Sequence, residues 1–228
     1  MKLTNREIRK LRIVSRSSMA FFDRKEAGLL LSNELKGLKG KDTVALGILR
    51  GGIIVALEVA LKIGAELDIV LSRKIGAPMN PELAVGAVSE NGELFVNKEA
   101  AASTSANDGY IQQEKNRQMA EIRRRSSLFR KIKPKISLEG KTVVVIDDGV
   151  ATGATLLAAL WAASQEHPKE LIAAIPVGPE EILKDLSKYA DKLICLKTPP
   201  YFSAVGQFYL QFNQTSDEEV LNILKKYK

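Results

Sequence analysis

Cysteine and histidine are almost absent from this chain. Cys195 is the only cysteine and His167 the only histidine among 228 residues. A lone cysteine cannot form a disulfide or a cysteine-based zinc site within one chain, and because Cys195 lies in an apolar run we expect a buried structural thiol. His167 precedes Pro168 at the end of a helical pattern, which predicts a loop residue. The sequence therefore argues against catalytic triads that depend on histidine.

Long apolar runs are absent as well. No stretch approaches the roughly 20 residues of a membrane-spanning helix, and residues 1–16 are too basic and too interrupted for a signal peptide. Hydrophobic residues make up 45% of the chain and charged residues 27%, as in ordinary folded domains. A length of 228 residues allows one sizeable core with insertions. We expect a soluble, cytoplasmic protein with no membrane partner.

Basic residues exceed acidic ones, with a formal net charge of +7. This balance suits nucleic acid or small polyanions and does not choose between them. The densest basic cluster comprises Arg123, Arg124, Arg125, Arg130, Lys131, Lys133 and Lys135. A solvated face is the expected use of such a cluster. Residues 1–20 form a basic N-terminal extension whose pattern suits an amphipathic helix packed on a neighbour.

Apolar runs and helical patterns alternate along the chain. Candidate strands lie at 43–49, 68–74, 142–147, 171–177 and 192–198. Candidate helices, where apolar residues recur at helical spacing, lie at 24–36, 53–63 and 156–163. The alternation predicts an α/β fold with a doubly wound, mostly parallel sheet.

Residues 84–135 depart from that alternation. The runs at 84–88 and 94–96 flank an Asn91-Gly92 turn and predict a hairpin beside the sheet. Residues 100–106, rich in Ala, Ser and Thr, predict a flexible connector. A capping signal at Asn107 then opens a long polar helix that ends near 131. Its few apolar residues predict packing on the domain surface or at a subunit contact.

The most informative segment follows the strand at 142–147. Two adjacent carboxylates, Asp147 and Asp148, precede a small, hydroxyl-rich turn made of Gly149, Val150, Ala151, Thr152, Gly153, Ala154 and Thr155. Carboxylates accept hydrogen bonds from sugar hydroxyls, whereas backbone N–H groups at the start of a helix bind phosphate. Open parallel sheets bind ligands at the carboxyl ends of strands. The segment therefore predicts a ribose-phosphate site, with an ordinary acidic turn and helix cap as the alternative.

Two further groups of basic and glycine residues follow strands. Arg50, Gly51 and Gly52 come after the strand at 43–49 and open a helix, which predicts a second anion-binding turn, or else a tight turn that needs glycine. Arg73 and Lys74 end the next strand beside a loop at 75–81. Both can bind phosphate oxygens. Plain surface exposure at a strand end is the alternative.

These segments resemble the type I phosphoribosyltransferase family, and within it a prokaryotic group of predicted phosphoribosyltransferases. The resemblance covers roughly residues 20–224. The motifs that carry it are Phe22-Asp23-Arg24, Ala27-Gly28, Arg50-Gly51-Gly52, Arg73-Lys74-Ile75-Gly76-Ala77-Pro78, Asn80-Pro81-Glu82-Leu83-Ala84 and the Asp147-Asp148 loop.

The resemblance implies that the chain binds phosphoribosyl pyrophosphate (PRPP). Asp147 and Asp148 would bind its ribose hydroxyls, and the turn at 149–155 would bind its 5′-phosphate. Arg50, Gly51 and Gly52 would bind pyrophosphate through a loop that in this family contains a cis peptide. Arg73 and Lys74 would stabilise the departing pyrophosphate, with the loop at 75–81 closing over the reaction. Mg²⁺ would be held mainly by substrate oxygens and water, with Asp147 and Asp148 near it.

The implied reaction transfers the phosphoribosyl group to a nitrogenous base and releases pyrophosphate. In enzymes specific for hypoxanthine and guanine, an aspartate stands where this chain has Ala151. That difference argues against the simplest interpretation, in which the acceptor base is a 6-oxopurine such as hypoxanthine or guanine. A hood at 197–214 would recognise the base, with Tyr201, Phe202 or Phe208 stacking on it. The resemblance also implies one phosphoribosyltransferase-like domain over 21–228 and a homodimer.

Two other functions remain open. A PRPP-sensing regulator would keep the fold and ligand and bind nucleic acid through residues 123–135 or the basic N-terminus, although we regard nucleic acid as the less favoured partner. A helper subunit with a vestigial site would neither release pyrophosphate nor bind nucleic acid.

Overall fold

The main sheet of the computed structural model, which describes residues 11–227, has six parallel strands. Their order is β1-β9-β8-β7-β2-β3. Their bounds are β1 (Leu11–Ser15), β2 (Thr43–Ile48), β3 (Glu66–Val70), β7 (Thr142–Ile146), β8 (Glu170–Val177) and β9 (Lys192–Lys197). Both faces of this sheet carry helices, as the near-continuous apolar strands predict. The predicted doubly wound α/β fold is confirmed.

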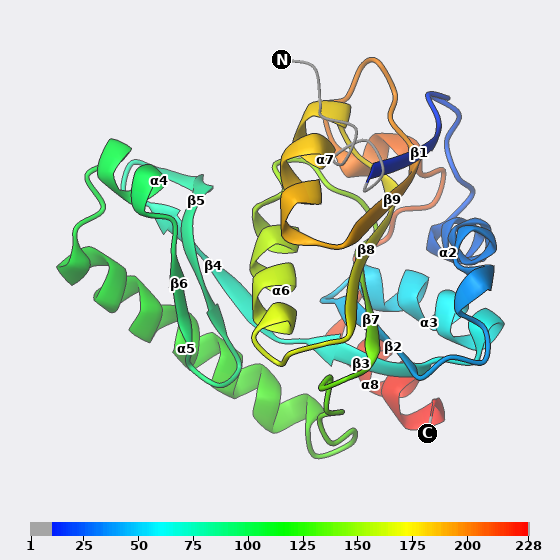
Figure 1. Cartoon of the computed structure of the whole chain (residues 1–228), viewed down its shortest axis with the longest axis horizontal. Coiled ribbons are helices and arrows are strands. Elements are labelled where there is room, and N and C mark those ends of the chain that lie inside the picture. The colour runs from blue at the N-terminus through cyan, green and yellow to red at the C-terminus, as the bar shows by residue number, and fades with distance from the viewer. Residues whose placement is uncertain (1–10, 228) are drawn as a thin grey trace.

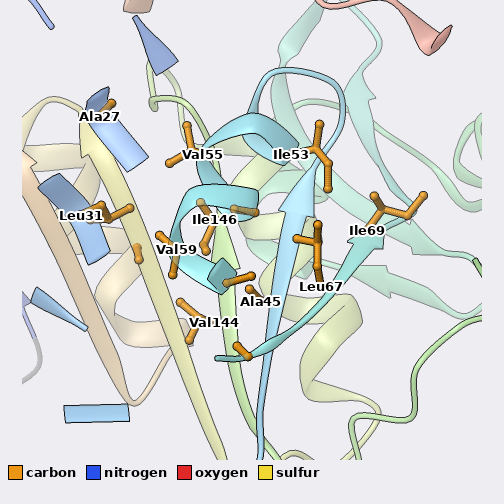
Figure 2. Packing of buried hydrophobic residues seen from close by; sticks show 14 of the residues in the cluster. Ala27, Leu31, Ala45, Ile53, Val55, Val59, Leu67, Ile69, Val144 and Ile146 are labelled. Atoms are coloured by element: carbon orange, nitrogen blue, oxygen red, sulfur yellow. The ribbon is translucent and has the colours of Figure 1, made fainter. Parts of the chain in front are cut away.

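Helices cover the sheet in two layers (Figure 1). One layer contains α2 (Arg24–Glu34), α3 (Gly52–Ile63) and α8 (Asp217–Lys226); the other contains α6 (Ala154–Ser164) and α7 (Glu180–Leu186). Successive strand residues alternate between the two cores, so Val144 packs with the α3 layer and Val145 with the α6 layer. Figure 2 shows Val55 and Val59 of α3 over Ala45 and Val144. Burial on both faces holds the strand ends rigidly in place.

The strand order reverses between β2 and β7. From β2 the chain runs outward to β3, and from β7 it runs the other way through β8 and β9. A crevice forms at the carboxyl ends of strands where an open sheet changes direction in this way. The loops after β2 and β7 therefore lie on the two sides of one crevice.

A second sheet of three antiparallel strands projects from the main sheet on the α6 side (Figure 1). It consists of β4 (Ser72–Ala77), β5 (Asn80–Ser89) and β6 (Leu94–Val96), followed by α4 (Lys98–Ser103) and α5 (Asp108–Phe129). We call residues 72–129 the arm. Phe95 of the arm packs on Trp161 of α6, with ring centroids 5.6 Å apart. The predicted hairpin is confirmed, and Gly92 adopts a φ of 83° in its turn.

The long polar helix is also confirmed as α5. The side chain of Asn107 accepts a hydrogen bond from the Tyr110 backbone N–H and caps its start. Ile111, Ile122 and Phe129 are its buried residues. Such a thin apolar stripe fits a helix that packs on the surface of the domain.

Four predictions about local structure were wrong. The strand at 68–74 divides at Leu71 into β3 and β4, and the expected loop at 75–81 is mostly strand, because β4 and β5 pair directly. The expected connector at 100–106 begins within α4, whose alanines favour helix. Residues 11–15 form strand β1 beside β9 instead of a helix, since pairing satisfies their backbone groups. Residues 1–10 of the basic N-terminal extension lie outside the described residues.

The basic cluster is largely paired with acids. Arg124 and Arg125 both bind Glu121, and Lys135 binds Glu166. Arg130 binds Asp68 at 2.6 Å and Glu90 at 3.0 Å, which attaches the end of α5 to β3 and to the end of β5. Arg124 and Lys135 are nevertheless exposed, as expected for a solvated face, and the expectation is wrong only for the largely buried Arg130. Within residues 11–227, none of the helices has both the length and the apolar surface that a membrane span requires.

Candidate functional site

Two loops touch at the crevice between β2 and β7. A side-chain carbon on Gly51 would lie 1.9 Å from Oδ2 of Asp148, and one on Gly52 would lie 2.7 Å from the carbonyl oxygen of Ile146. Only glycine permits so close an approach. The peptide bond between Leu49 and Arg50 is cis, as the resemblance implied. The structure thus brings the Arg50 turn against the acidic pair.

The two carboxylates of the pair have different surroundings. Oδ1 of Asp147 accepts a hydrogen bond of 2.9 Å from the backbone N–H of Asp148. Burial, and then the neighbouring Asp148, raise the pKa of Asp147 well above its usual range. Oδ2 of Asp148 instead accepts a hydrogen bond of 2.7 Å from Nε of Arg24. The carboxyl group of Asp147 is thus buried, which disfavours its charged form, whereas the carboxylate of Asp148 is paired with Arg24.

Arg24 is a site residue whose role sequence reasoning missed. It begins α2, is only 8% exposed, and donates from Nη1 to the carbonyl oxygen of Asn213 at 2.8 Å. Its guanidinium lies 3.9 Å from the centre of the Phe212 ring. The motif Phe22-Asp23-Arg24 and the capping position of Asp23 were visible in the sequence. The contact of Arg24 with Asp148, 124 residues away along the chain, was not visible there.

Aromatic residues after β9 close over the same pair. The hydroxyl of Tyr209 donates to the backbone carbonyl of Asp148 at 2.5 Å. Phe208 is 1% exposed and stacks on Phe202, with centroids 5.2 Å apart, so it belongs to the core. The prediction that Phe208 stacks on a base was therefore wrong, because its ring faces are covered. Tyr201 is 83% exposed and makes no such core contact.

The turn after Asp148 presents small and hydroxylated residues at the start of α6. Ala151, Thr152 and Thr155 are exposed. Gly153 adopts a φ of 82°, which favours glycine, and precedes the first residue of α6, Ala154. These exposed groups stand at the positive end of a helix, where anions bind.

Gly149 and Val150 differ from the rest of this turn. Both are buried, and the N–H of Val150 donates to the carbonyl of Val177 at 2.9 Å. A side-chain carbon on Gly149 would lie 2.5 Å from the Val205 side chain. These contacts attach the start of the turn to the core. The later residues Thr152 and Thr155 remain exposed.

Arg73 and Lys74 line a cavity of about 610 Å³ together with Leu49 and Thr155. Nε of Arg73 donates to Oε1 of Gln118 in α5 at 2.8 Å. Burial, and then the charge of Arg125, lower the pKa of Arg73. Lys74 lies 2.9 Å from Glu82 and its side chain is 25% exposed. Plain surface exposure does not describe these two residues.

Arg50 lies across the crevice from α6, the helix that follows Asp147 and Asp148 in the chain. Its Nη1 is 4.0 Å from Oδ1 of Asp217, the first residue of α8. The Arg50 side chain is 33% exposed, so it keeps access to a ligand.

Cys195 and His167 stand apart from this chemistry. Cys195 is buried in β9, and burial raises the pKa of its thiol to about 12, which suppresses the reactive thiolate. His167 is exposed in the turn after α6, with a φ of 52°. Both sequence predictions are confirmed.

Comparison with known proteins points to one family. Residues 24–213 match the model of the phosphoribosyl transferase domain. Two curated Mycobacterium tuberculosis proteins, "Putative phosphoribosyl transferase Rv0571c" of strain H37Rv and "Putative phosphoribosyl transferase MT0597" of strain CDC 1551, are each 41% identical over 206 residues, covering 90% of this chain and 46% of theirs. The chain thus spans about half the length of the curated relatives it matches.

A solved structure is similar over nearly its whole length. The protein TT1426 from Thermus thermophilus has a TM-score of 0.84 and 43% sequence identity, and the match covers 92% of this chain and 99% of that one. Only 8% of this chain lies outside the match.

Proposed function

Because this chain belongs to the phosphoribosyltransferase family, we propose that it transfers the 5-phosphoribosyl group of PRPP to a nitrogenous base and releases pyrophosphate. The observation that carries the proposal is the contact between the Arg50 turn and the Asp147-Asp148 pair at the reversal of strand order. A sugar that carries phosphates at two positions needs both an acidic and an anion-binding element, and the crevice offers both.

Asp147 and Asp148 bind the ribose hydroxyls in this proposal. Each carboxylate has a second oxygen besides the one that the backbone or Arg24 engages. Exposed Ala151, Thr152 and Thr155 bind the 5′-phosphate with Gly153 and Ala154, since the backbone N–H groups at the start of α6 favour an anion. The sugar is then held at both ends, which positions its anomeric carbon.

Pyrophosphate binds the turn of Arg50, Gly51 and Gly52, with Arg73 and Lys74 beside it. The reaction breaks the bond between the anomeric carbon and the pyrophosphate oxygen, and a ring nitrogen of the acceptor forms the new bond. Negative charge grows on the leaving oxygen, so fixed cations stabilise the transition state more than the bound substrate. These residues supply charge and position without forming a covalent intermediate.

The acidic pair fits a magnesium ion that is bound mostly by its substrate. Within residues 11–227, no group of three or more His, Cys, Asp or Glu side chains is placed to hold a metal. Mg²⁺ commonly uses one or two carboxylates with phosphate oxygens and water. Asp147 and Asp148 would hold it, and it would supply further positive charge to the phosphates.

The acceptor binds under the hood in this proposal. Tyr201 and Phe212 are its exposed aromatic residues, at 83% and 37%, and Phe212 already covers Arg24. Ala151 offers no carboxylate to exchange a proton with a purine. We therefore favour an acceptor whose nucleophilic nitrogen needs no acid at that position.

We also propose that residues 21–228 form one phosphoribosyltransferase-like domain and that the protein acts as a homodimer. The family match over residues 24–213 supports the first statement. Family resemblance alone supports the second, and light scattering would measure the mass in solution.

An acceptor screen tests the activity. The protein, PRPP and MgCl₂ are incubated with single purine, pyrimidine and pyridine bases, and released pyrophosphate is measured by a coupled assay. Release above the rate without base, with one class of base, supports the proposal. Release with none of the bases, together with no binding of PRPP in calorimetry, contradicts it.

A second experiment tests the site. We expect the double variant Asp147→Asn/Asp148→Asn to lose PRPP binding, because neutral amides attract neither the metal nor the hydroxyl donors as carboxylates do. Asp42→Asn is the control, because its side chain is 71% exposed and it precedes the amino end of β2, at the edge of the sheet opposite the crevice. Unchanged binding in the double variant would remove these residues from the site.

A further inference from the structure

Arg24 joins three parts of the molecule that the proposed function treats separately. It is the first residue of α2, its Nε donates to the carboxylate of Asp148, and its Nη1 donates to the backbone carbonyl of Asn213 in the hood. The ring centre of Phe212, also in the hood, lies 3.9 Å from its Cζ atom. The proposed ribose acid and the proposed acceptor-binding segment are therefore connected through one side chain.

The start of α2 fixes the place of Arg24. Oδ1 of Asp23 accepts a hydrogen bond of 2.8 Å from the backbone N–H of Glu26, and the carboxylate of Glu26 accepts one from the N–H of Phe22. This reciprocal cap holds the first turn of the helix in place. Further along α2, a side-chain carbon on Gly28 would lie 2.7 Å from a side chain of α3, so the two helices pack very closely. Arg24 is thus mounted on a firmly held helix end.

The segment before α2 carries the hood. Backbone hydrogen bonds of 2.8 Å pair residues 21–22 with residues 208–211. The N–H of Phe21 donates to the carbonyl of Phe208, and the N–H of Leu210 donates back to the carbonyl of Phe21. The hood is therefore attached to the same stretch of chain that ends in Arg24, and a shift of the hood is transmitted to that residue.

A guanidinium suits this position because its donors lie in one plane. Nε reaches Asp148 at 2.7 Å while Nη1 reaches Asn213 at 2.8 Å. The side chain of Arg24 is 10% exposed and that of Asp148 is 15% exposed, so water competes little for the ion pair. A lysine ammonium keeps the charge but does not reproduce this planar fork.

The bond to Arg24 also gives the Asp148 carboxylate a direction. Oδ2 accepts from Arg24, whereas Oδ1 forms no hydrogen bond with any residue among 11–227. The terminal torsion of an aspartate side chain is broad unless a contact restricts it. Holding Oδ2 therefore orients Oδ1 in advance, and an acceptor oriented before binding costs less to engage.

Phe212 is connected to Asp148 by a second route. Its ring stacks on the ring of Tyr209, with centroids 5.0 Å apart, and the Tyr209 hydroxyl donates to the backbone carbonyl of Asp148. One aromatic residue of the hood thus supports both the side chain and the backbone of the same acid.

From these contacts we propose that Arg24 is a positioning residue that couples the hood to Asp148, so that an acceptor in the hood and PRPP at the acidic pair strengthen each other's binding. This inference rests on the proposed function, because it takes Asp148 to bind the ribose. An acceptor that packs on Phe212 fixes the guanidinium, which keeps Oδ1 of Asp148 directed at the sugar. Coupling of this kind is reciprocal, so PRPP alone makes the hood more rigid.

Calorimetric titration of PRPP with MgCl₂, without any acceptor, tests the contact with the acid. We expect Arg24→Lys to weaken PRPP binding by about tenfold although the charge is kept, because one charge-assisted hydrogen bond is lost or misdirected. Arg12→Lys is the matched control, since Arg12 binds Glu34 at the other end of α2 and its side chain is 66% exposed. It should bind PRPP within about twofold of the unaltered protein.

Phe212→Leu tests the hood end of the connection without changing a charge. We expect PRPP to bind about threefold more weakly, the effect of a lost cation–π contact at a partly exposed site. Leu210→Ala is the control, because Leu210 lies in the same segment and is 71% exposed. Phe212 is 37% exposed, so its variant should fold even if Arg24→Lys does not, and thermal unfolding checks both.

Hydrogen exchange followed by mass spectrometry gives a result that a purely structural role of Arg24 would not produce. In the unaltered protein, PRPP should slow the exchange of the backbone amides of Leu210 and Gln211, which bond to the segment before α2. In Arg24→Lys, at a PRPP concentration that saturates the variant, this slowing should be lost.

The outcomes separate this inference from the proposed function. If the unaltered protein does not bind PRPP, both are wrong. If it binds PRPP, and Arg24→Lys and Phe212→Leu bind as tightly as their controls, the function stands and the coupling is wrong. The coupling is also wrong if PRPP leaves the exchange of the hood amides unchanged in the unaltered protein, because Arg24 then orients the acid without reaching the hood.

Discussion

Gly51 is the residue at which the two site loops come closest. An added side-chain carbon would meet the carboxylate of Asp148 at 1.9 Å and Nε of Arg24 at 2.8 Å. The backbone of Gly51 is helical, with φ −65° and ψ −37°, so the space and not the conformation demands glycine. The strand-to-helix turn is thus shaped by its partner loop.

We expect Gly51→Ala to weaken PRPP binding by at least about tenfold and to lower the free energy of unfolding by about 2 kcal/mol, since the methyl group forces Asp148 and Arg24 apart. Calorimetry and urea unfolding measure the two effects. Gly37→Ala is the control, because a side-chain carbon there meets no atom within 4 Å. Equal behaviour of the two variants would show that the loops separate freely.

The ionised form of Asp147 lowers the stability of the folded protein. Burial and the neighbouring Asp148 raise its pKa well above the usual range. At pH values below the unfolded pKa both the folded and unfolded states hold the proton, and no penalty applies. As the pH rises through the raised folded pKa, the folded state loses stability relative to the unfolded state. A carboxylate retained under these conditions suits a functional role.

We therefore expect Asp147→Asn to raise the free energy of unfolding at pH 7.5, with a gain that shrinks as the pH falls toward about 4, the ordinary pKa of aspartate. Chemical unfolding at a series of pH values measures this difference. Asp42→Asn, at a position 71% exposed in its side chain, is the comparison variant. A gain in Asp147→Asn that grows in acid would mean the pKa is lowered instead.

At the scale of elements, a group of ion pairs around Arg130 attaches the arm to the main sheet. Asp68 is 1% exposed and also accepts a hydrogen bond of 3.0 Å from the backbone N–H of Ile136. Arg130 neutralises it and reaches Glu90 at the end of β5. This ion-pair group joins β3, β5 and the end of α5, so it attaches that end of the helix to the main sheet.

Arg130→Met should lower the free energy of unfolding by about 3 kcal/mol, because it leaves a buried carboxylate without its partner. Urea unfolding at neutral pH measures the change. For comparison, Arg124→Met removes a 54% exposed side chain from the same helix and should change stability by less than about 0.5 kcal/mol. If both variants were equally stable, α5 would not be anchored through Arg130.

At the scale of the whole molecule, the net charge of +7 has a structural explanation other than nucleic acid. Within the described part of the chain, Arg124, Arg125, Arg130 and Lys135 engage acidic residues of the same chain. Arg73, Arg117 and Arg125 face the cavity beside the site. Positive charge is thus concentrated where a phosphorylated substrate is proposed to bind.

We expect only weak nucleic-acid binding, with dissociation constants of roughly 10⁻⁶ to 10⁻⁴ M near physiological salt, which is the non-specific range. Fluorescence anisotropy with single-stranded and double-stranded oligonucleotides at two salt concentrations measures this. Nanomolar affinity that falls steeply with salt would instead favour the PRPP-sensing regulator.

The sequence by itself determined the alternation of strands and helices, the acidic pair, the glycine turn and the polar helix α5. These follow from apolar spacing, capping residues and turn residues, which act over a few neighbours along the chain. Alanine-rich α4 and strand β1 were mispredicted where several local interpretations were nearly equal.

Only the tertiary structure decided which distant residues meet. It placed Arg24 on Asp148, covered Phe208, and turned Arg117 and Arg125 toward Arg73 across the cavity. Such contacts depend on the strand order and on how each helix packs, so no local pattern encodes them. The two acids could be read from the chain, but the cavity beside Arg73 exists only because α5 packs next to β4.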